Sequence, residues 1–278
     1  MLATDFVYDD IKLSDKGYII CDFDDKSGVE IVDVGSTITF NKIKRDSGRI
    51  YTLASATYDE CITATFDICK NDCRFDSQHM ELSTQEFREI MQWLNRREFL
   101  PFRIVDDKQT VCWYNASFNV DKIVIGGKIY GARLTMETDR PFGYDDKVIA
   151  GAYTLTSSNP SVYIMNTSNE IGYLYPIVKV KCSTGGNLTI TNQLEGCVTT
   201  IKNCSNSEEI ILNGETQTIE TNNENGHTKK KIHNDFNWEF PRLGTKMIRG
   251  QVVRSNLIIT SIPCKITYEF RPIVKDVP

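Results

Sequence analysis

The chain has 278 residues, of which 40% are hydrophobic and 25% charged, and its formal net charge is -5. This length predicts about two domains, and the composition is that of an ordinary globular protein, which argues against disorder. The mild acidity disfavours a sequence-specific nucleic-acid-binding protein, because such proteins carry a basic patch and a high pI. The mild acidity is compatible with a channel wall past which DNA slides, since such a wall needs few contacts to phosphate.

The sequence shows no signal for a membrane or for secretion. No apolar run approaches the roughly 20 residues of a membrane-spanning helix, and Met1–Asp10 lacks the basic start and apolar stretch of a signal peptide. We therefore expect no membrane insertion and a protein kept in the cytosol. In that reducing compartment the nine cysteines, an odd number, are expected to be free thiols rather than a disulfide framework.

Strand patterns open the chain. Phe6–Tyr8 and Tyr18–Cys21 are short apolar runs, and Ile62–Ile68 alternates large apolar residues with small or polar ones. Alternation with a period of two is typical of a strand that buries one face. The first half of the chain is therefore expected to form a sheet.

One helix is expected over about Thr84–Arg97. Ser83 and Glu86 fit a capping box, in which each side chain satisfies the backbone N–H of the other residue. The apolar residues that follow recur at helical spacing and should pack on the sheet. They are Phe87, Ile90, Met91 and Leu94.

A hairpin is expected where Gly126 and Gly127 separate two alternating runs. A Gly-Gly pair supplies the two positive φ angles of a type I′ turn. Its tip places Ile125 and Ile129 beside the turn, so we predict Ile125, Gly126, Gly127 and Ile129 as an oligomer interface. An ordinary hairpin within one subunit is the alternative.

The composition of the sequence changes near residue 145, after the segment Pro141–Tyr144, whose proline and glycine interrupt regular structure. We therefore expect two domains, 1–145 and 146–278. The second half has many short strand patterns between turn residues, with no helical periodicity, which indicates a jelly-roll β-sandwich. Asn213-Gly214 is its strongest hairpin signal. The fold class is mainly β, with a β-sandwich or split-barrel-like N-terminal domain that carries one α-helix.

Metal-binding patterns are weak. Cys69, Cys73 and His79, even with Cys61, do not form the two tight ligand pairs of a zinc site. Asp22 and the acidic residues after it suggest calcium, but the following glycine comes one position too late for an EF-hand loop. Incidental thiols and a solvated acidic turn are the preferred interpretations, so no metal is predicted.

The polar stretch over residues 222–234 contains His227, His233 and three consecutive lysines. The histidine spacing does not match a ligand pair on one helical face. Contact with an acidic partner is an alternative, but a solvated loop is the preferred interpretation.

Catalytic patterns are also missing. The sequence has neither a Gly-x-Ser-x-Gly nucleophile elbow nor a phosphate-binding Gly-x-x-x-x-Gly-Lys loop. We therefore predict no catalytic residue and no cofactor. Aromatic residues of the second half are candidates for stacking on sugar rings or contacting a partner, although filling the core is the commoner role. These candidates are Tyr163, Tyr173, Tyr175 and Trp238.

Three stretches resemble the distal tail proteins of siphophages, which are long-tailed bacterial viruses. The first is the strand pattern of residues 62–68 followed by the helix with Trp93-Leu94. The second runs from Trp113–Ala116 through the Gly-Gly hairpin to 134–144, a strand with a Pro-centred exit. The third is the segment 234–243, which is followed by an apolar strand. The order of these patterns follows the family along nearly the whole chain.

This resemblance implies a hexameric ring of N-terminal domains with galectin-like C-terminal sandwiches, located in the virion at the tail tip and assembled in the host cytoplasm. It implies a central channel for tape-measure protein and DNA, with the tail tube and the tail hub or tail-associated lysin as neighbours. A receptor-binding protein or a host glycan is a further implied partner. A carbohydrate-binding module acting in host-surface adhesion is the alternative function, and an esterase or glycosidase is a weaker third.

Overall fold

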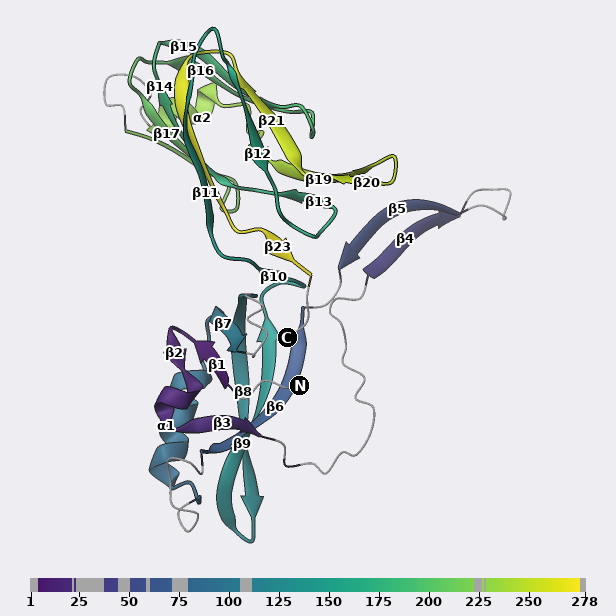
Figure 1. The fold of residues 1–278 in the computed structure, drawn as a ribbon, viewed down its shortest axis with the longest axis vertical. Helices are drawn as coiled ribbons and strands as arrows, with labels where there is room; N and C mark the ends of the chain where they lie inside the picture. The colour runs from purple at the N-terminus through teal and green to yellow at the C-terminus, as the bar shows by residue number, and fades with distance from the viewer. Residues whose placement is uncertain are drawn as a thin grey trace. The chain divides into compact units, whose positions relative to one another are not determined.

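A computed structural model describes residues 5–21, 23, 38–44, 51–58, 61–71, 80–105, 112–222, 227 and 229–275 (Figure 1). The chain divides into two compact units, the first ending at Tyr144 and the second spanning Asp145–Val274, with Lys275 grouped with the first. Each unit has its own hydrophobic core. Neither helix in the described ranges is long and apolar enough to cross a membrane.

The first unit is built on a seven-stranded antiparallel sheet in the order β2-β1-β7-β8-β9-β6-β3. A 3-10 turn, η1 (Leu13–Lys16), links β2 to β3 along the chain. The strands are β1 (Asp5–Tyr8), β2 (Ile11–Lys12), β3 (Tyr18–Cys21), β6 (Thr63–Lys70), β7 (Leu100–Val105), β8 (Tyr114–Ile125) and β9 (Lys128–Thr138).

The expected helix is confirmed as α1 (Thr84–Leu94), which covers one face of this sheet (Figure 1). Both bonds of the capping box are present: Ser83 Oγ accepts from the Glu86 N–H at 3.2 Å, and Glu86 Oε2 accepts from the Ser83 N–H at 2.7 Å. The helix ends three residues earlier than expected, because Asn95 leaves the helical conformation and donates its side-chain amide to the Phe118 carbonyl.

An aromatic cluster forms the centre of the first core. The Phe118 ring lies 5.0 Å from the ring of Tyr8 and 5.4 Å from that of Phe102, and Phe6 stacks on Trp93 at 5.8 Å. Side chains that alternate along the strands meet the buried face of α1 here. The helix thus closes the core on one side of the sheet.

A separate two-stranded sheet is formed by β4 (Ile38–Lys44) and β5 (Tyr51–Tyr58). Every side chain of β4 is exposed, and so are those of residues 53–57 on β5. No burial against a core holds this hairpin in the described residues.

The second unit is a β-sandwich. Its larger sheet has the order β11-β22-β14-β17-β18 and its smaller one β12-β21-β15-β16, and both contribute to a single apolar core. The strands of the two sheets are β11 (Val148–Leu155), β12 (Ser161–Met165), β14 (Ile177–Cys182), β15 (Gly186–Asn192), β16 (Cys197–Cys204), β17 (Glu209–Asn213), β18 (Thr218–Thr221), β21 (Ser255–Thr260) and β22 (Cys264–Phe270).

A third, three-stranded sheet in the second unit has the order β13-β19-β20. Its strands are β13 (Gly172–Leu174), β19 (Leu243–Ile248) and β20 (Gln251–Val253). Two further short strands are β10 (Gly143–Tyr144) and β23 (Ile273–Val274). The mainly β fold class, with one helix in the first domain and a sandwich in the second, is confirmed.

Two details of the second unit differ from expectation. A short helix, α2 (Lys229–Asp235), occupies the C-terminal part of the stretch expected to be a solvated loop. It forms because Ile232 is fully buried in the sandwich core, together with the adjacent Phe236. The hairpin signalled by Asn213-Gly214 exists, but Asn213 pairs with Thr218, so the connection is four residues long rather than two.

Candidate interaction surfaces

The β8–β9 hairpin ends in the expected turn. Gly126 and Gly127 have φ angles of +58° and +81°, and nothing lies within 4 Å of where their side chains would be. Ile125 is 55% exposed and the preceding Val124 is 53% exposed. Apolar side chains at an open tip are available to a partner.

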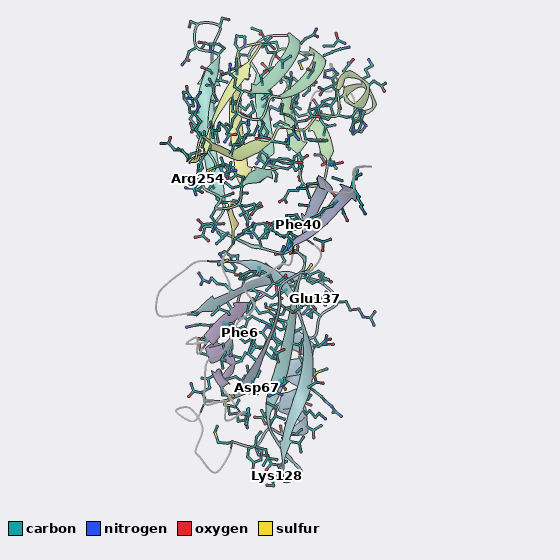
Figure 2. The ribbon with its side chains drawn as sticks, turned by 90° about the vertical axis from the view of Figure 1, so that its right-hand side faces the viewer. Phe6, Phe40, Asp67, Lys128, Glu137 and Arg254 are labelled. Carbon is teal, nitrogen blue, oxygen red and sulfur yellow. The ribbon has the colours of Figure 1, made fainter. Side chains whose placement is uncertain are left out.

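Ile129 lies differently from the other three predicted interface residues. It is half-buried and packs against the core of the first unit. Its carbonyl accepts a hydrogen bond from the Leu82 N–H at 2.7 Å, and the neighbouring Lys128 forms a 2.7 Å ion pair with Glu81 (Figure 2). Ile129 therefore anchors the hairpin, while Ile125 presents apolar surface. The role of these residues in an interface stays a prediction.

The β4–β5 hairpin carries a larger apolar surface that the sequence analysis did not identify. Ile38 lies opposite Tyr58 and Phe40 lies opposite Ala56, so their side chains share one face. Phe40 (Figure 2) is 52% exposed, and Leu53, which pairs with Lys42 after a bulge, is 55% exposed. The alternation at Ile38 and Phe40 was the signal available in the sequence.

A third hairpin, β19–β20, turns at Arg249 and Gly250, which have φ angles of +50° and +79°. Met247, Ile248 and Val252 beside the turn are all exposed. The same feature therefore recurs in both units: a tight hairpin with apolar side chains in solvent.

The four aromatic candidates do not form one site. Tyr163 lies on β12 and is exposed. Tyr173 on β13 contacts Tyr175 edge-on at 5.5 Å, and Arg242 lies over the Tyr173 ring at 4.7 Å. Tyr175 packs partly on the core, and burial raises its pKa.

Trp238, the fourth aromatic candidate, lies just after α2 and is 57% exposed. Its ring contacts those of His233 and Phe236, each at 5.6 Å. The aromatic residues that the structure does bring together are Tyr173 and Tyr175, so they are the pair best placed to meet a ligand.

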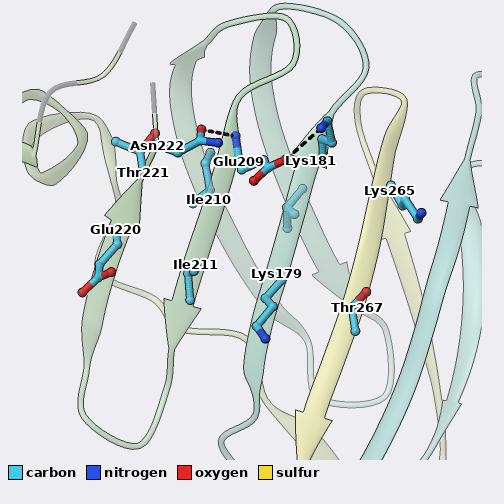
Figure 3. Close-up of a pocket in the computed structure, with 11 residues that line it drawn as sticks. Lys179, Lys181, Glu209, Ile210, Ile211, Glu220, Thr221, Asn222, Lys265 and Thr267 are labelled. Atoms are coloured by element: carbon cyan, nitrogen blue, oxygen red, sulfur yellow. Dashed lines mark hydrogen bonds and ion pairs between the residues drawn. The ribbon is translucent and has the colours of Figure 1, made fainter. Parts of the chain in front are cut away.

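An open hollow of about 270 Å³ lies over the outer face of the larger sheet (Figure 3). Lys179, Lys181 and Lys265 line it together with Glu209 and Glu220. Lys181 and Glu209 form an ion pair at 2.7 Å. None of the four aromatic candidates lines this hollow, so it gives no support to a sugar-stacking site.

Most residues of the zinc and calcium patterns, which were not predicted to bind metal, lie outside the described residues. Cys73 and His79 lie outside the described residues, as do Asp22 and the acidic residues that follow it. Cys61 and Cys69 lie at partly buried positions of the first unit. The preferred interpretation as incidental thiols stays a prediction.

The structure corrects the interpretation of the polar stretch at His227. This residue is only 2% exposed, with Nδ1 2.9 Å from Glu208 Oε1 and Nε2 3.0 Å from Asp235 Oδ2. Burial alone would lower the pKa of His227, but the hydrogen bonds and charges of the two carboxylates raise it. Glu208 is distant in sequence, so no local spacing could have signalled this contact.

A buried thiol lies beside the same histidine, and a second buried thiol contacts the first. Cys204, at the end of β16, has a donor atom within 4.8 Å of those of Glu208 and His227. A hydrogen bond between Cys182 and Cys204 lowers the pKa of Cys204 and raises that of Cys182. The cluster thus combines sulfur, nitrogen and oxygen donors inside the sandwich.

Comparison with known proteins identifies the family. Residues 1–140 match the model of a phage tail protein N-terminal domain, and residues 142–270 match the model of a phage tail C-terminal domain. The chain belongs to this phage tail protein family. No curated protein matches it significantly in sequence.

A solved structure has the same fold. The chain is similar to the Dit protein (gp 19.1) of phage SPP1, described as a paradigm of the hub adsorption apparatus in phages that infect Gram-positive bacteria, with a TM-score of 0.61. The similarity covers 96% of this chain and 98% of that one at 12% sequence identity. The suspected resemblance to distal tail proteins is therefore confirmed at the level of family and fold.

Proposed function

We propose that this phage tail protein is a subunit of a hexameric ring that joins the tail tube to the tail hub and leaves a channel through which DNA passes. Its first domain, residues 1–145, forms the ring, and the galectin-like second domain, residues 146–278, lies outside it. The protein is a component of the virion, assembled in the host cytoplasm. Its role is mechanical rather than enzymatic.

The exposed apolar face of the β4–β5 hairpin carries this proposal. An isolated two-stranded hairpin is marginally stable in water, yet all the described side chains of β4 are exposed. Ile38, Phe40 and Leu53 are between 42% and 55% exposed. A surface of this kind is stabilised when a second chain covers it.

A hairpin that projects from one subunit onto the next can close a ring. A projecting element on one subunit that binds a different surface of the next forms a head-to-tail interface, and a head-to-tail interface with the right rotation closes into a ring. The tip of β8–β9, with Ile125 exposed, is the second contact of the proposed interface. Few phosphate contacts are needed in the channel, which agrees with a net charge of -5.

The expected neighbours are the tape-measure protein in the channel, the tail tube on one side and the tail hub or tail-associated lysin on the other. The apolar residues of β19–β20 offer the second domain its own surface for a further tail component, such as a receptor-binding protein. Membership of a phage tail protein family supports the proposal of tail components as partners.

The test is the assembly state of the purified protein. Light scattering should give a mass about six times that of the 31.7 kDa chain, and negative-stain microscopy should show rings. Phe40→Asp should reduce the assembled fraction at least tenfold. Thr39→Asp is the matched control, since Thr39 lies on the other face of the same strand. Monomers of the unaltered protein at high concentration would contradict the proposal.

Binding of a host glycan is a second candidate function, and the exposed Tyr173 ring favours it. This ring contacts Tyr175 and the Arg242 guanidinium, which leaves an aromatic face and hydrogen-bond donors together. Glycan-array binding by the whole protein should fall in Tyr173→Ala and stay unchanged in Tyr163→Ala. Equal binding by both variants would exclude this site.

A further inference from the structure

We infer that Cys204, Glu208 and His227 form a structural zinc site at the end of the β-sandwich, with Cys182 as the fourth ligand. Zinc prefers a tetrahedral set of sulfur, nitrogen and oxygen donors, and a structural site fills all four positions from the protein. The inference concerns the interior of the second unit and does not depend on ring formation.

The three donor atoms are already gathered. They lie within 4.8 Å of one another, and the residues that carry them are buried. The corners of a tetrahedron around zinc lie about 3.3–3.8 Å apart, given bonds of about 2.0–2.3 Å. The 2.9 Å between His227 Nδ1 and Glu208 Oε1 would therefore open slightly to admit the ion between them.

Cys182 supplies the fourth donor. It ends β14, and its thiol shares a hydrogen bond with Cys204. Backbone bonds tie it to the turn that carries the carboxylate: the Cys182 N–H donates to the Glu208 carbonyl at 2.8 Å, and the Ser207 N–H donates to the Cys182 carbonyl at 2.9 Å. Its thiol is not among the donors that lie within 4.8 Å of one another, so the Cys182 side chain would turn toward Glu208 and His227 to complete the tetrahedron.

The groups around the donors suit a metal. Glu208 is positioned by the Ser205 N–H at 2.7 Å and by the Thr221 hydroxyl at 2.8 Å. The other ring nitrogen of His227 lies 3.0 Å from Asp235 Oδ2. Metal-binding histidines usually donate their second ring N–H to a carboxylate, which fixes the tautomer and the ring orientation.

The ion would offset two of the three negative charges that Cys182, Cys204 and Glu208 carry as ligands. A buried carboxylate is costly unless a positive group compensates it, and the side chain of Glu208 is fully buried. In the proposed site both thiols and the Nδ1 position of His227 have lost their protons, since zinc binds thiolate and neutral imidazole. The ion would hold residue 227, and with it the start of α2, to the ends of β14 and β16.

The test begins with tag-free protein purified without chelator. Elemental analysis should find about one zinc per chain. Replacement by Co²⁺ should give the charge-transfer absorption of thiolate–Co²⁺ bonds and the intense visible bands of tetrahedral Co²⁺.

Variants then assign the ligands. Cys204→Ser should abolish the thiolate bands or weaken zinc binding at least 100-fold. Asp235→Asn should weaken it about 10- to 100-fold as a residue that positions the histidine. Cys197→Ser is the matched control, because Cys197 is also a buried thiol but contacts Glu239 and the Phe240 carbonyl instead; its zinc affinity should match the unaltered protein.

Two results would overturn the inference. One is unaltered protein that binds neither zinc nor Co²⁺ more tightly than about 10 μM in a chelator competition. The other is a disulfide between Cys182 and Cys204 in protein kept under reducing conditions, detected by mass spectrometry. Because both experiments use the unaltered chain, a variant that fails to fold leaves the inference testable.

Discussion

The two compact units bury different kinds of side chain. The core of the first is largely aromatic and aliphatic, with Phe6, Phe102 and Phe118 at its centre. The first also buries a few polar residues, among them Asp67 and Lys70, and the second encloses more of them, including Asn256, which is fully buried, and His227. The second unit thus relies more on buried hydrogen bonds to fix one arrangement of its loops, whereas exposed apolar hairpins occur in both units.

The comparison predicts two independent unfolding transitions, and Phe118→Ala should produce the largest shift. Its ring is 1% exposed and contacts those of Tyr8 and Phe102. Loss of a buried phenyl group costs about 3–5 kcal/mol. Calorimetry should show the transition of the first unit at much lower temperature and that of the second unchanged. A shift of both transitions by the same amount would contradict separate cores.

Asn256→Ala should shift the unfolding transition of the second unit instead of the first, by a somewhat smaller amount. The Asn256 side chain accepts from the Gly244 N–H at 2.7 Å and donates to the Gly244 carbonyl at 3.0 Å. It also accepts from the amide of Asn192 at 2.9 Å. Its removal leaves buried polar groups without partners, which costs about 2–4 kcal/mol. The same calorimetric trace should now show only the second transition shifted, and an unchanged second transition would be the contrary result.

Ser83→Ala tests the N-terminal cap of α1. It should destabilise the first unit by about 1 kcal/mol, because it removes the acceptor for the Glu86 N–H. Thr84→Ala, at the next and exposed position, is the control and should not destabilise it. Chemical denaturation monitored by circular dichroism measures both. Equal destabilisation by the two variants would show that the cap bond contributes nothing specific.

The smallest expected effect depends on pH. Ion pairs with Lys147, at 2.7 Å, and with Lys179 hold the pKa of Glu269 below its usual value. A lowered pKa gives stability that is present at neutral pH and is lost as pH falls through the folded-state pKa. Glu269→Gln should therefore lower the free energy of unfolding of the second unit at pH 7. The expected decrease is about 0.5 kcal/mol, because solvent screens these exposed lysines.

At low pH the difference between Glu269→Gln and the unaltered protein should vanish, because Glu269 is then protonated in both states. Glu220→Gln, which removes an exposed carboxylate from β18 at the edge of the same sheet, is the control and should change stability less at pH 7. A difference that persists undiminished in acid would assign the effect of Glu269 to packing rather than to charge.

Local signals in the sequence predicted much of this fold. The capping box at Ser83 and the helical spacing after it located α1, and the Gly126-Gly127 pair located the β8–β9 turn. Each of these features depends on residues close together in the chain. The family resemblance rested on the same features and on their order.

The features that were missed depend on distant contacts. The helix α2 has only one apolar residue, Ile232, among Lys229–Asp235, so no helical spacing of apolar residues predicts it. The environment of His227 is set by Glu208, which is 19 residues away. The strands β4 and β5 were not predicted, and the alternation at Ile38 and Phe40 would have indicated a strand without saying that no core covers it.

Hydrogen–deuterium exchange of the β4–β5 hairpin tests the central claim most directly. The account predicts that amides of residues 38–44 and 51–58 exchange slowly in the assembled protein and rapidly in dissociated Phe40→Asp, while amides of β14 exchange equally slowly in both. Thr39→Asp should behave as the unaltered protein. Equal, rapid exchange of the hairpin in assembled and dissociated protein would contradict the claim that neighbouring subunits cover it.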